Sequence, residues 1–166
     1  MDLTNYARTM ADYNRWINER LYESCAALPD EQRKRDMGAF FKSIHGTLNH
    51  LLLADRVWMG RFTGVPFKVR SLDQELYADY AELSAERART DQAIADWAAS
   101  LRPADFDGEL SYVSISNPQP RKSPFGLTVV HFFNHQTHHR GQVTALMKQS
   151  GVDPGVTDLL WMPAKA

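Results

Sequence analysis

The sequence has little of three features that would narrow its class. Cys25 is its only cysteine, so an intramolecular disulfide is excluded and a reducing compartment is favoured. The formal net charge is only -1, so charge gives no reason to expect a polyanion such as nucleic acid as a partner. The apolar runs are too short to span a bilayer, and residues 1–20 carry polar and charged side chains throughout, unlike a secretory signal. We therefore expect a cytoplasmic protein that binds neither nucleic acid nor membrane.

The composition is that of an ordinary globular protein, with 43% hydrophobic and 23% charged residues. A length of 166 residues fits one domain with a sizeable core, so we expect residues 1–166 to form a single domain. Cys25 falls near the end of a predicted helix, where we interpret it as a small core or edge residue. The alternative interpretation, a catalytic thiol, would require an electropositive site around it.

Four long segments repeat apolar residues every three or four positions, a spacing that predicts amphipathic helices. They cover about residues 4–28, 39–62, 71–102 and 124–149, and proline or glycine follows each one. Ser71 with Gln74 predicts a capping box at the start of the third segment. Ser123 is the predicted cap of the fourth, with Pro124 in its first turn. The predicted fold is all-α, a four-helix bundle with short links.

The connection before the fourth helix, residues 104–123, is the longest. Residues 110–115 have some strand character and turn-forming residues follow them, so a short hairpin and an extended loop both fit. The length of this connection allows one crossover in the order of the helices. At the other end of the chain, the tail carries Leu159, Leu160 and Trp161, which we expect to pack back on the bundle because a free tail would not favour such residues.

The six histidines are not scattered but lie on the second and fourth predicted helices. They are His45, His50, His131, His135, His138 and His139. At about 100° per residue, the four on the fourth helix fall within an arc of roughly 100°. An i,i+4 pair such as His135 and His139 places two imidazoles on one face, a spacing that lets one helix give two ligands to one metal ion. Polar surface and a buried hydrogen-bonded network are the alternatives, but four histidines on one face favour metal binding.

Periodicity leaves the contribution of the second helix open. His45 and His50 flank its apolar stripe about 140° apart, so one ion is expected to contact only one of them. Asp55 lies within the stripe itself, where a carboxylate must be paired or hydrogen-bonded. We predict an ion pair with Arg140. The alternatives are a hydrogen bond that orients a ligand histidine and, less favoured, direct coordination.

Two motifs together resemble a known family. The stretch SIHGTLNHLLLADRVWMGRF, from Ser43 to Phe62, and the stretch HFFNHQTHHRGQV, from His131 to Val143, resemble the second-helix and fourth-helix motifs of the DinB family (DinB/YfiT-like proteins). Segment order and length extend the resemblance over nearly the whole chain.

The resemblance implies a four-helix bundle that holds one divalent metal ion through three histidines. By motif position these are His50, His135 and His139. His45 is then not a ligand. The side chains expected to line the pocket or to support the ligands are Asp55, His131, His138 and Arg140. Three neutral ligands are typical of a catalytic zinc site with an open position, and nickel or iron suits the same imidazoles.

The resemblance also places the chain in a superfamily of thiol-dependent enzymes that use bacillithiol or mycothiol. The favoured hypothesis is therefore a metal-dependent S-transferase that joins a low-molecular-weight thiol to a small electrophile. A metal-dependent hydrolase is one alternative. A non-catalytic metal-binding protein of the stress response is another. A homodimer is a further implication, and no residue is assigned as catalytic.

Overall fold

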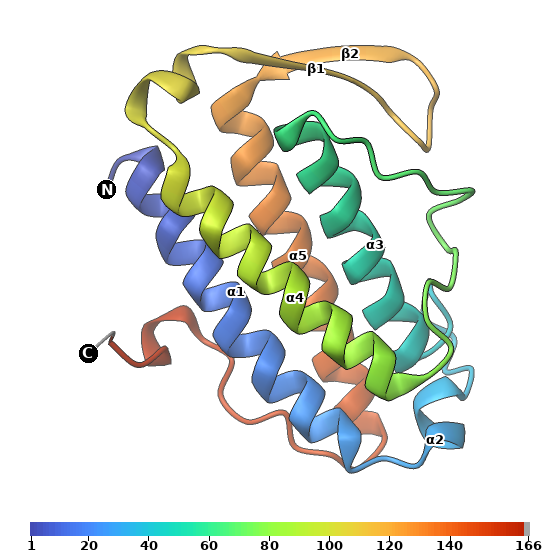
Figure 1. The fold of residues 1–166 in the computed structure, drawn as a ribbon. Helices are drawn as coiled ribbons and strands as arrows, with labels where there is room; N and C mark the ends of the chain where they lie inside the picture. The colour runs from blue at the N-terminus through green and yellow to red at the C-terminus, as the bar shows by residue number, and fades with distance from the viewer. Residues whose placement is uncertain (165–166) are drawn as a thin grey trace.

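Four long helices lie side by side in the computed structural model, which describes residues 1–164 (Figure 1). They are α1 (Leu3–Ala26), α3 (Ile44–Thr63), α4 (Tyr80–Ser100) and α5 (Phe125–Gln149). Helices α1 and α3 each pack against both α4 and α5. The short α2 (Asp30–Lys34) lies at one end of these helices. The predicted, mainly helical structure is confirmed, and no helix in residues 1–164 is long and apolar enough to cross a membrane.

A two-stranded sheet covers the other end. It pairs β1 (Glu109–Val113) with β2 (Pro120–Pro124) in antiparallel register, after the short 3-10 helix η1 (Pro103–Asp107). Of the two structures that the sequence allowed here, the hairpin is the one present. Ser123 pairs with Leu110 within this sheet, so the prediction that Ser123 caps α5 is wrong. Pro124 precedes α5 instead, without a side-chain cap.

The helix α3 begins five residues later than predicted. Ser43 is its N-cap, and the Ser43 hydroxyl accepts a hydrogen bond of 3.0 Å from the Gly46 amide. The preceding residues form a tight turn in which Ala39 pairs with Lys42, and Lys42 adopts a positive φ of 66°. At the other end Gly64 is left-handed, with a φ of 75°, and terminates the helix as glycine commonly does.

The helix α4 begins much later than predicted, so the capping box at Ser71 is wrong. Asp79 is the N-cap and accepts a hydrogen bond of 2.9 Å from the Glu82 amide. The preceding segment is irregular, and buried Asn49 holds it through bonds of 2.9 and 3.0 Å from the amides of Leu76 and Tyr77 to the Asn49 side-chain oxygen. These residues are apolar because they pack on the core, not because they are helical.

The same segment is the crossover of the fold. Helices α3 and α4 run in the same direction, so residues 64–79 must return along the length of the helices, beside α3 (Figure 1). The length of the connection before α5 allowed a crossover there, but the crossover lies one connection earlier. This position matters for function because it lays irregular backbone along α3 next to His50.

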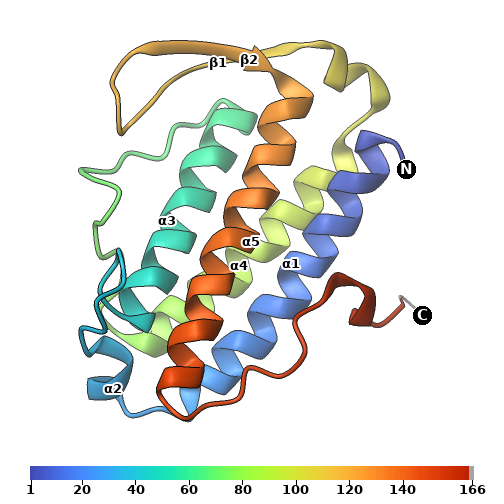
Figure 2. The same cartoon turned by 180° about the vertical axis from the view of Figure 1, so that it is seen from behind.

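The C-terminal tail runs back beside α1 (Figure 2), where the Tyr13 hydroxyl donates a hydrogen bond of 2.5 Å to the Thr157 carbonyl. The tail therefore packs back on the helices as expected, and Leu159 lines a hollow beside Tyr13. Two side chains of the 3-10 helix η2 (Leu159–Trp161) stay in solvent, since Leu160 is 95% exposed and Trp161 is 68% exposed. The expectation is therefore wrong for these two side chains only.

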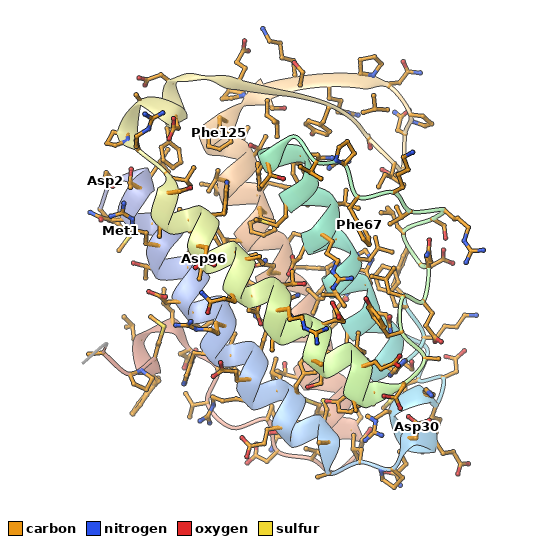
Figure 3. All side chains as sticks on the ribbon, viewed as in Figure 1. Met1, Asp2, Asp30, Phe67, Asp96 and Phe125 are labelled. Carbon is orange, nitrogen blue, oxygen red and sulfur yellow. The ribbon has the colours of Figure 1, made fainter. Side chains whose placement is uncertain are left out.

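Side chains fill the space between the helices (Figure 3) and form two apolar clusters, one toward α2 and one toward the hairpin. Between them lies a buried polar layer to which all four long helices contribute. Its members are Asn14, Asn18, Asp55, Arg87, Asp91, Gln136 and Arg140. Two aspartates and two arginines balance one another in charge, as buried ions must. Along α5, His135 and His139 each directly precede a residue of this layer, Gln136 and Arg140.

Candidate metal centre

Three histidines come together on the flank between α3 and α5. They are His50 from α3 and His135 and His139 from α5, and their nearest ring nitrogens all lie within 4.8 Å of one another. The Nε2 atoms of His135 and His139 are 3.1 Å apart. Two nitrogen ligands on a tetrahedral zinc ion, with bonds of about 2.0–2.1 Å, would be separated by roughly 3.3 Å. All three donors are of the type that divalent ions bind, and the His135–His139 pair is close to the spacing of two ligands on one ion.

Hydrogen bonds orient two of these imidazoles. His50 Nδ1 lies 2.8 Å from the Leu72 carbonyl, and His139 Nδ1 lies 2.7 Å from Gln142 Oε1. Both oxygens only accept, so both Nδ1 atoms carry the proton and both Nε2 atoms present a lone pair. Partners of this kind fix the tautomer and ring orientation of metal-binding histidines. The 3.1 Å contact is therefore either a hydrogen bond that His135 Nε2–H donates to His139 Nε2 or the separation of two nitrogens that share a cation.

The protonation state also suits metal binding. Burial, together with the charges of the neighbouring histidines, lowers the pKa of His135 to about 3. Burial likewise lowers the pKa of His139 to about 4, and it lowers the pKa of His50. All three imidazoles are then neutral at pH 7, which is the form that coordinates a metal.

Phe41 closes one side of the histidine cluster. Its ring stacks on His50 at 3.8 Å between centroids and meets His139 edge-on at 5.6 Å. The turn that carries Phe41 lies against α3 at Gly46, where a Cβ atom would come within 2.2 Å of the Phe41 carbonyl oxygen. Only glycine permits this approach. The sequence did not identify Phe41 or Gly46 as part of the site, because both fell within the helix predicted for about residues 39–62.

The other side of the cluster opens into a pocket of about 350 Å³, which we call the histidine pocket. It lies between α3, α5, the hairpin and the crossover segment. The lining residues are His50, Ala54, Val57, Trp58, Arg61, Leu72, Tyr112, Ser114, Ile115, Ser116, Arg121, His131 and His135. A ligand in this space has direct access to two of the three clustered histidines.

The remaining histidines lie outside the cluster. His45 is buried on the other flank of α3 and its Nε2 donates to the Tyr77 carbonyl at 2.9 Å. His131 lines the histidine pocket, with its ring 6.1 Å from that of His135. His138 is exposed, meets His139 edge-on at 4.8 Å, and accepts a hydrogen bond of 3.3 Å at its Nε2 from Gln142 Nε2. Of the two alternatives on α3, His50 is therefore the one that joins His135 and His139.

The predicted ion pair between Asp55 and Arg140 is wrong. Asp55 Oδ2 accepts from Arg87 at 2.6 Å and Oδ1 accepts from Gln136 at 2.9 Å. Arg140 instead donates to the side-chain oxygen of Asn14. Within residues 1–164 no hydrogen bond joins Asp55 to a histidine, so the alternative of a ligand-orienting carboxylate fails as well. Arg87 was missed because sequence periodicity does not tell which helix is the neighbour of α3.

Cys25 is not placed to act as a nucleophile. It is buried among apolar residues at the α2 end of the core. Burial raises the pKa of its thiol to about 12, so the thiol stays protonated at neutral pH. The interpretation of Cys25 as a core residue agrees with this position.

Comparison with known proteins agrees with the fold and the motifs. The family model described as the DinB family matches residues 1–166. The chain is similar to Protein DinB of Bacillus subtilis (strain 168), with 24% identity over 159 residues, covering 94% of this chain and 92% of that protein. Its fold is similar to the crystal structure of a DinB-like protein from Bacillus cereus ATCC 10987, with a TM-score of 0.62, 18% identity and 91% of each chain covered. The chain belongs to the DinB family.

Proposed function

We propose that this protein is a single domain, built as a four-helix bundle, that holds one divalent metal ion through Nε2 of His50, His135 and His139. The observation that carries the proposal is the convergence of three neutral imidazoles, two of them with Nδ1 protonated and Nε2 free. Zinc and nickel are the ions we expect, because both accept imidazole ligands in this number.

We further propose that the protein is an S-transferase that joins a low-molecular-weight thiol to a small electrophile. A divalent ion bound here would supply an electropositive centre that lowers the pKa of a thiol or a water molecule. The protein itself supports the use of an external thiol, because its one cysteine is buried and protonated elsewhere. The histidine pocket gives such reactants access to His50 and His135.

The family resemblance and the free cysteine support a reducing, cytoplasmic location. The resemblance also implies a homodimer. The exposed Leu160 and Trp161 support association with a second copy, since large apolar side chains of this kind are often covered by a partner.

Metal content tests the site directly. We expect one equivalent of zinc or nickel in the native protein by elemental analysis, and none in the His135→Ala, His139→Ala double variant. The exposed His138→Ala variant is the matched control and should retain the ion. Equal metal content in the double variant and the native protein would rule out the site.

The reaction requires a separate test. A panel of small thiols, including bacillithiol and mycothiol, would be paired with aryl halide and epoxide electrophiles, using metal-loaded and chelated protein. Metal-dependent thioether formation supports the transferase. Metal-dependent hydrolysis of ester or amide substrates would replace it with the hydrolase alternative. Turnover of neither class would favour a non-catalytic metal-binding protein of the stress response.

A further inference from the structure

Arg61 is a half-buried cation without a carboxylate partner. Its guanidinium packs against two adjoining aromatic rings, with Cζ 4.4 Å from the centre of the Trp58 ring and 4.6 Å from that of Tyr112. Its one hydrogen bond in the described part of the chain goes to the Val113 carbonyl at 3.1 Å. Burial lowers the pKa of Arg61, which means that its surroundings do not compensate its charge.

Two other buried or partly buried arginines have direct carboxylate partners, and Arg140 shares the buried polar layer with Asp55 and Asp91 although it forms no ion pair. Arg56 pairs with Glu86, and Arg87 pairs with both Asp55 and Asp91. Holding an arginine out of water without a carboxylate costs stability, so natural proteins rarely keep one unless it has a ligand. Arg61 differs from these arginines because, within residues 1–164, no carboxylate contributes to the electrostatics of its guanidinium.

A second arginine lies at the same end of the histidine pocket. Arg121 of β2 stands opposite Tyr112 of β1, and residues directly opposed in an antiparallel pair project from the same face of the sheet. Both arginines line the pocket, and none of its lining residues is aspartate or glutamate. Within residues 1–164, no acidic side chain forms an ion pair with Arg61 or Arg121. The pocket thus has a positive end that lacks an anion.

Ring contacts connect this positive end to the histidine cluster. Arg61 packs against the Trp58 ring, and the centre of that ring lies 5.1 Å from the centre of the His131 ring. The His131 ring lies 6.1 Å from His135. One small molecule in a pocket of about 350 Å³ can therefore face arginine at one end and the clustered histidines at the other.

We propose that the histidine pocket binds a small organic carboxylate, whose charged group contacts Arg61 and Arg121 while its other end faces His50 and His135. Arginine binds carboxylates through parallel N–H···O bonds, and the contacts with the Trp58 and Tyr112 rings hold the guanidinium in place for them. A carboxylate fits better than a phosphate ester, because the pocket offers no helix N-terminus or glycine-rich loop to a phosphate. In terms of the proposed function, this assigns a carboxylate to the electrophile or the thiol.

Binding to the metal-free protein tests this inference independently of the reaction. Succinate, the uncharged succinamide and inorganic phosphate would each be titrated into chelator-treated protein by calorimetry. We expect succinate to bind more tightly than the other two. Arg61→Gln should weaken succinate at least about tenfold, which is the loss of one charge-assisted contact. Arg121→Gln, a substitution at an exposed position of the hairpin, should also weaken succinate binding.

The control is Arg20→Gln, which removes an arginine that also stacks on a tryptophan, Trp16, but lies on another face. It should bind succinate as the native protein does. Thermal melting of each variant identifies any loss of fold, and Arg61→Lys keeps the charge if glutamine disrupts packing. Equal affinity for succinate and succinamide, no measurable succinate binding, or undiminished binding in both arginine variants would overturn the proposal. Tighter binding of phosphate than of succinate would overturn the carboxylate assignment.

The two proposals can fail separately. If the His135→Ala, His139→Ala variant still bound succinate but the native protein held no metal, the carboxylate pocket would stand without the metal function. If metal content depended on the histidines but succinate binding did not depend on Arg61 and Arg121, the metal site would stand without the carboxylate pocket. Metal content of Arg61→Gln should equal that of the native protein, because Arg61 is not among the clustered donors.

Discussion

Asp55 Oδ1 accepts a hydrogen bond of 2.9 Å from Gln136 Nε2, one residue beyond His135 on α5. The other oxygen of Asp55 accepts from Arg87 of α4 at 2.6 Å. Three helices are thereby tied together at the level of the histidine cluster. A polar contact at one level sets the register of helices more sharply than apolar packing does, because a shifted register leaves charges unpaired.

Asp55→Ala should therefore lower both stability and metal affinity. Removing one partner of a buried ion pair costs about 3 kcal/mol or more, because Arg87 keeps its charge with only Asp91 to offset it. Urea denaturation gives the free energy of unfolding, and a chelator competition gives the metal affinity. Asp96→Ala, on the exposed face of α4, should change neither. A loss below about 1 kcal/mol in Asp55→Ala, within the range of ordinary substitutions, would contradict the prediction.

Gln142→Leu should weaken metal binding without removing a ligand. Gln142 Oε1 accepts a hydrogen bond of 2.7 Å from His139 Nδ1. Without this bond the His139 ring is free to rotate and to change tautomer. Substitution of such orienting partners typically costs about 10–100-fold in metal affinity. Chelator competition with the native protein measures the change. Gln149→Leu, at the exposed end of the same helix, is the control, and equal affinities in the two variants would count against the assigned role.

The stability of the metal-free protein should fall as the pH drops below about 6.5. The folded-state pKa values of His135 and His139 are about 3 and 4, below the ordinary value for histidine. Between these limits the unfolded chain binds protons that the folded chain does not, so acid favours unfolding. Chemical denaturation at pH 7 and pH 5 tests this. The His135→Gln, His139→Gln variant should lose less stability over the same interval, and an identical loss would assign the dependence to other groups.

Gly141→Ala should stabilise the protein. Gly141 lies within α5, and a Cβ atom there would meet nothing within 4 Å. Alanine is favoured over glycine in a helix interior by about 1 kcal/mol, and no neighbour opposes the added methyl group. Thermal or urea denaturation gives the change, which should leave metal content unaltered. By contrast Gly46→Ala should destabilise, because its Cβ would lie 2.2 Å from the Phe41 carbonyl oxygen.

The sequence predicts most of what a single helix determines. The i,i+4 pair of His135 and His139 converges as its spacing requires, and α5 begins within a residue or so of its predicted start. Features that depend on neighbours were missed. The partner of Asp55 lies on α4, which periodicity could not place beside α3.

The crossover segment was misread for a related reason. Leu72 and Leu76 have helical spacing, yet the chain there must span the length of the helices, and tertiary packing overrides local preference. Phe41 was likewise assigned to α3, although Gly46 allows a turn to pack at that point. Such close backbone approaches leave no periodic signal in the sequence.

The bond between His50 and the Leu72 carbonyl has a thermodynamic consequence. Leu72 belongs to irregular backbone, which can open locally at less cost than the helices on either side. An ion that requires His50 in one orientation favours the closed segment, and by reciprocity a closed segment favours the ion. Amide hydrogen exchange in residues 64–79 should therefore slow when metal binds. Local opening of the crossover segment would then depend on whether the histidine cluster holds a metal ion.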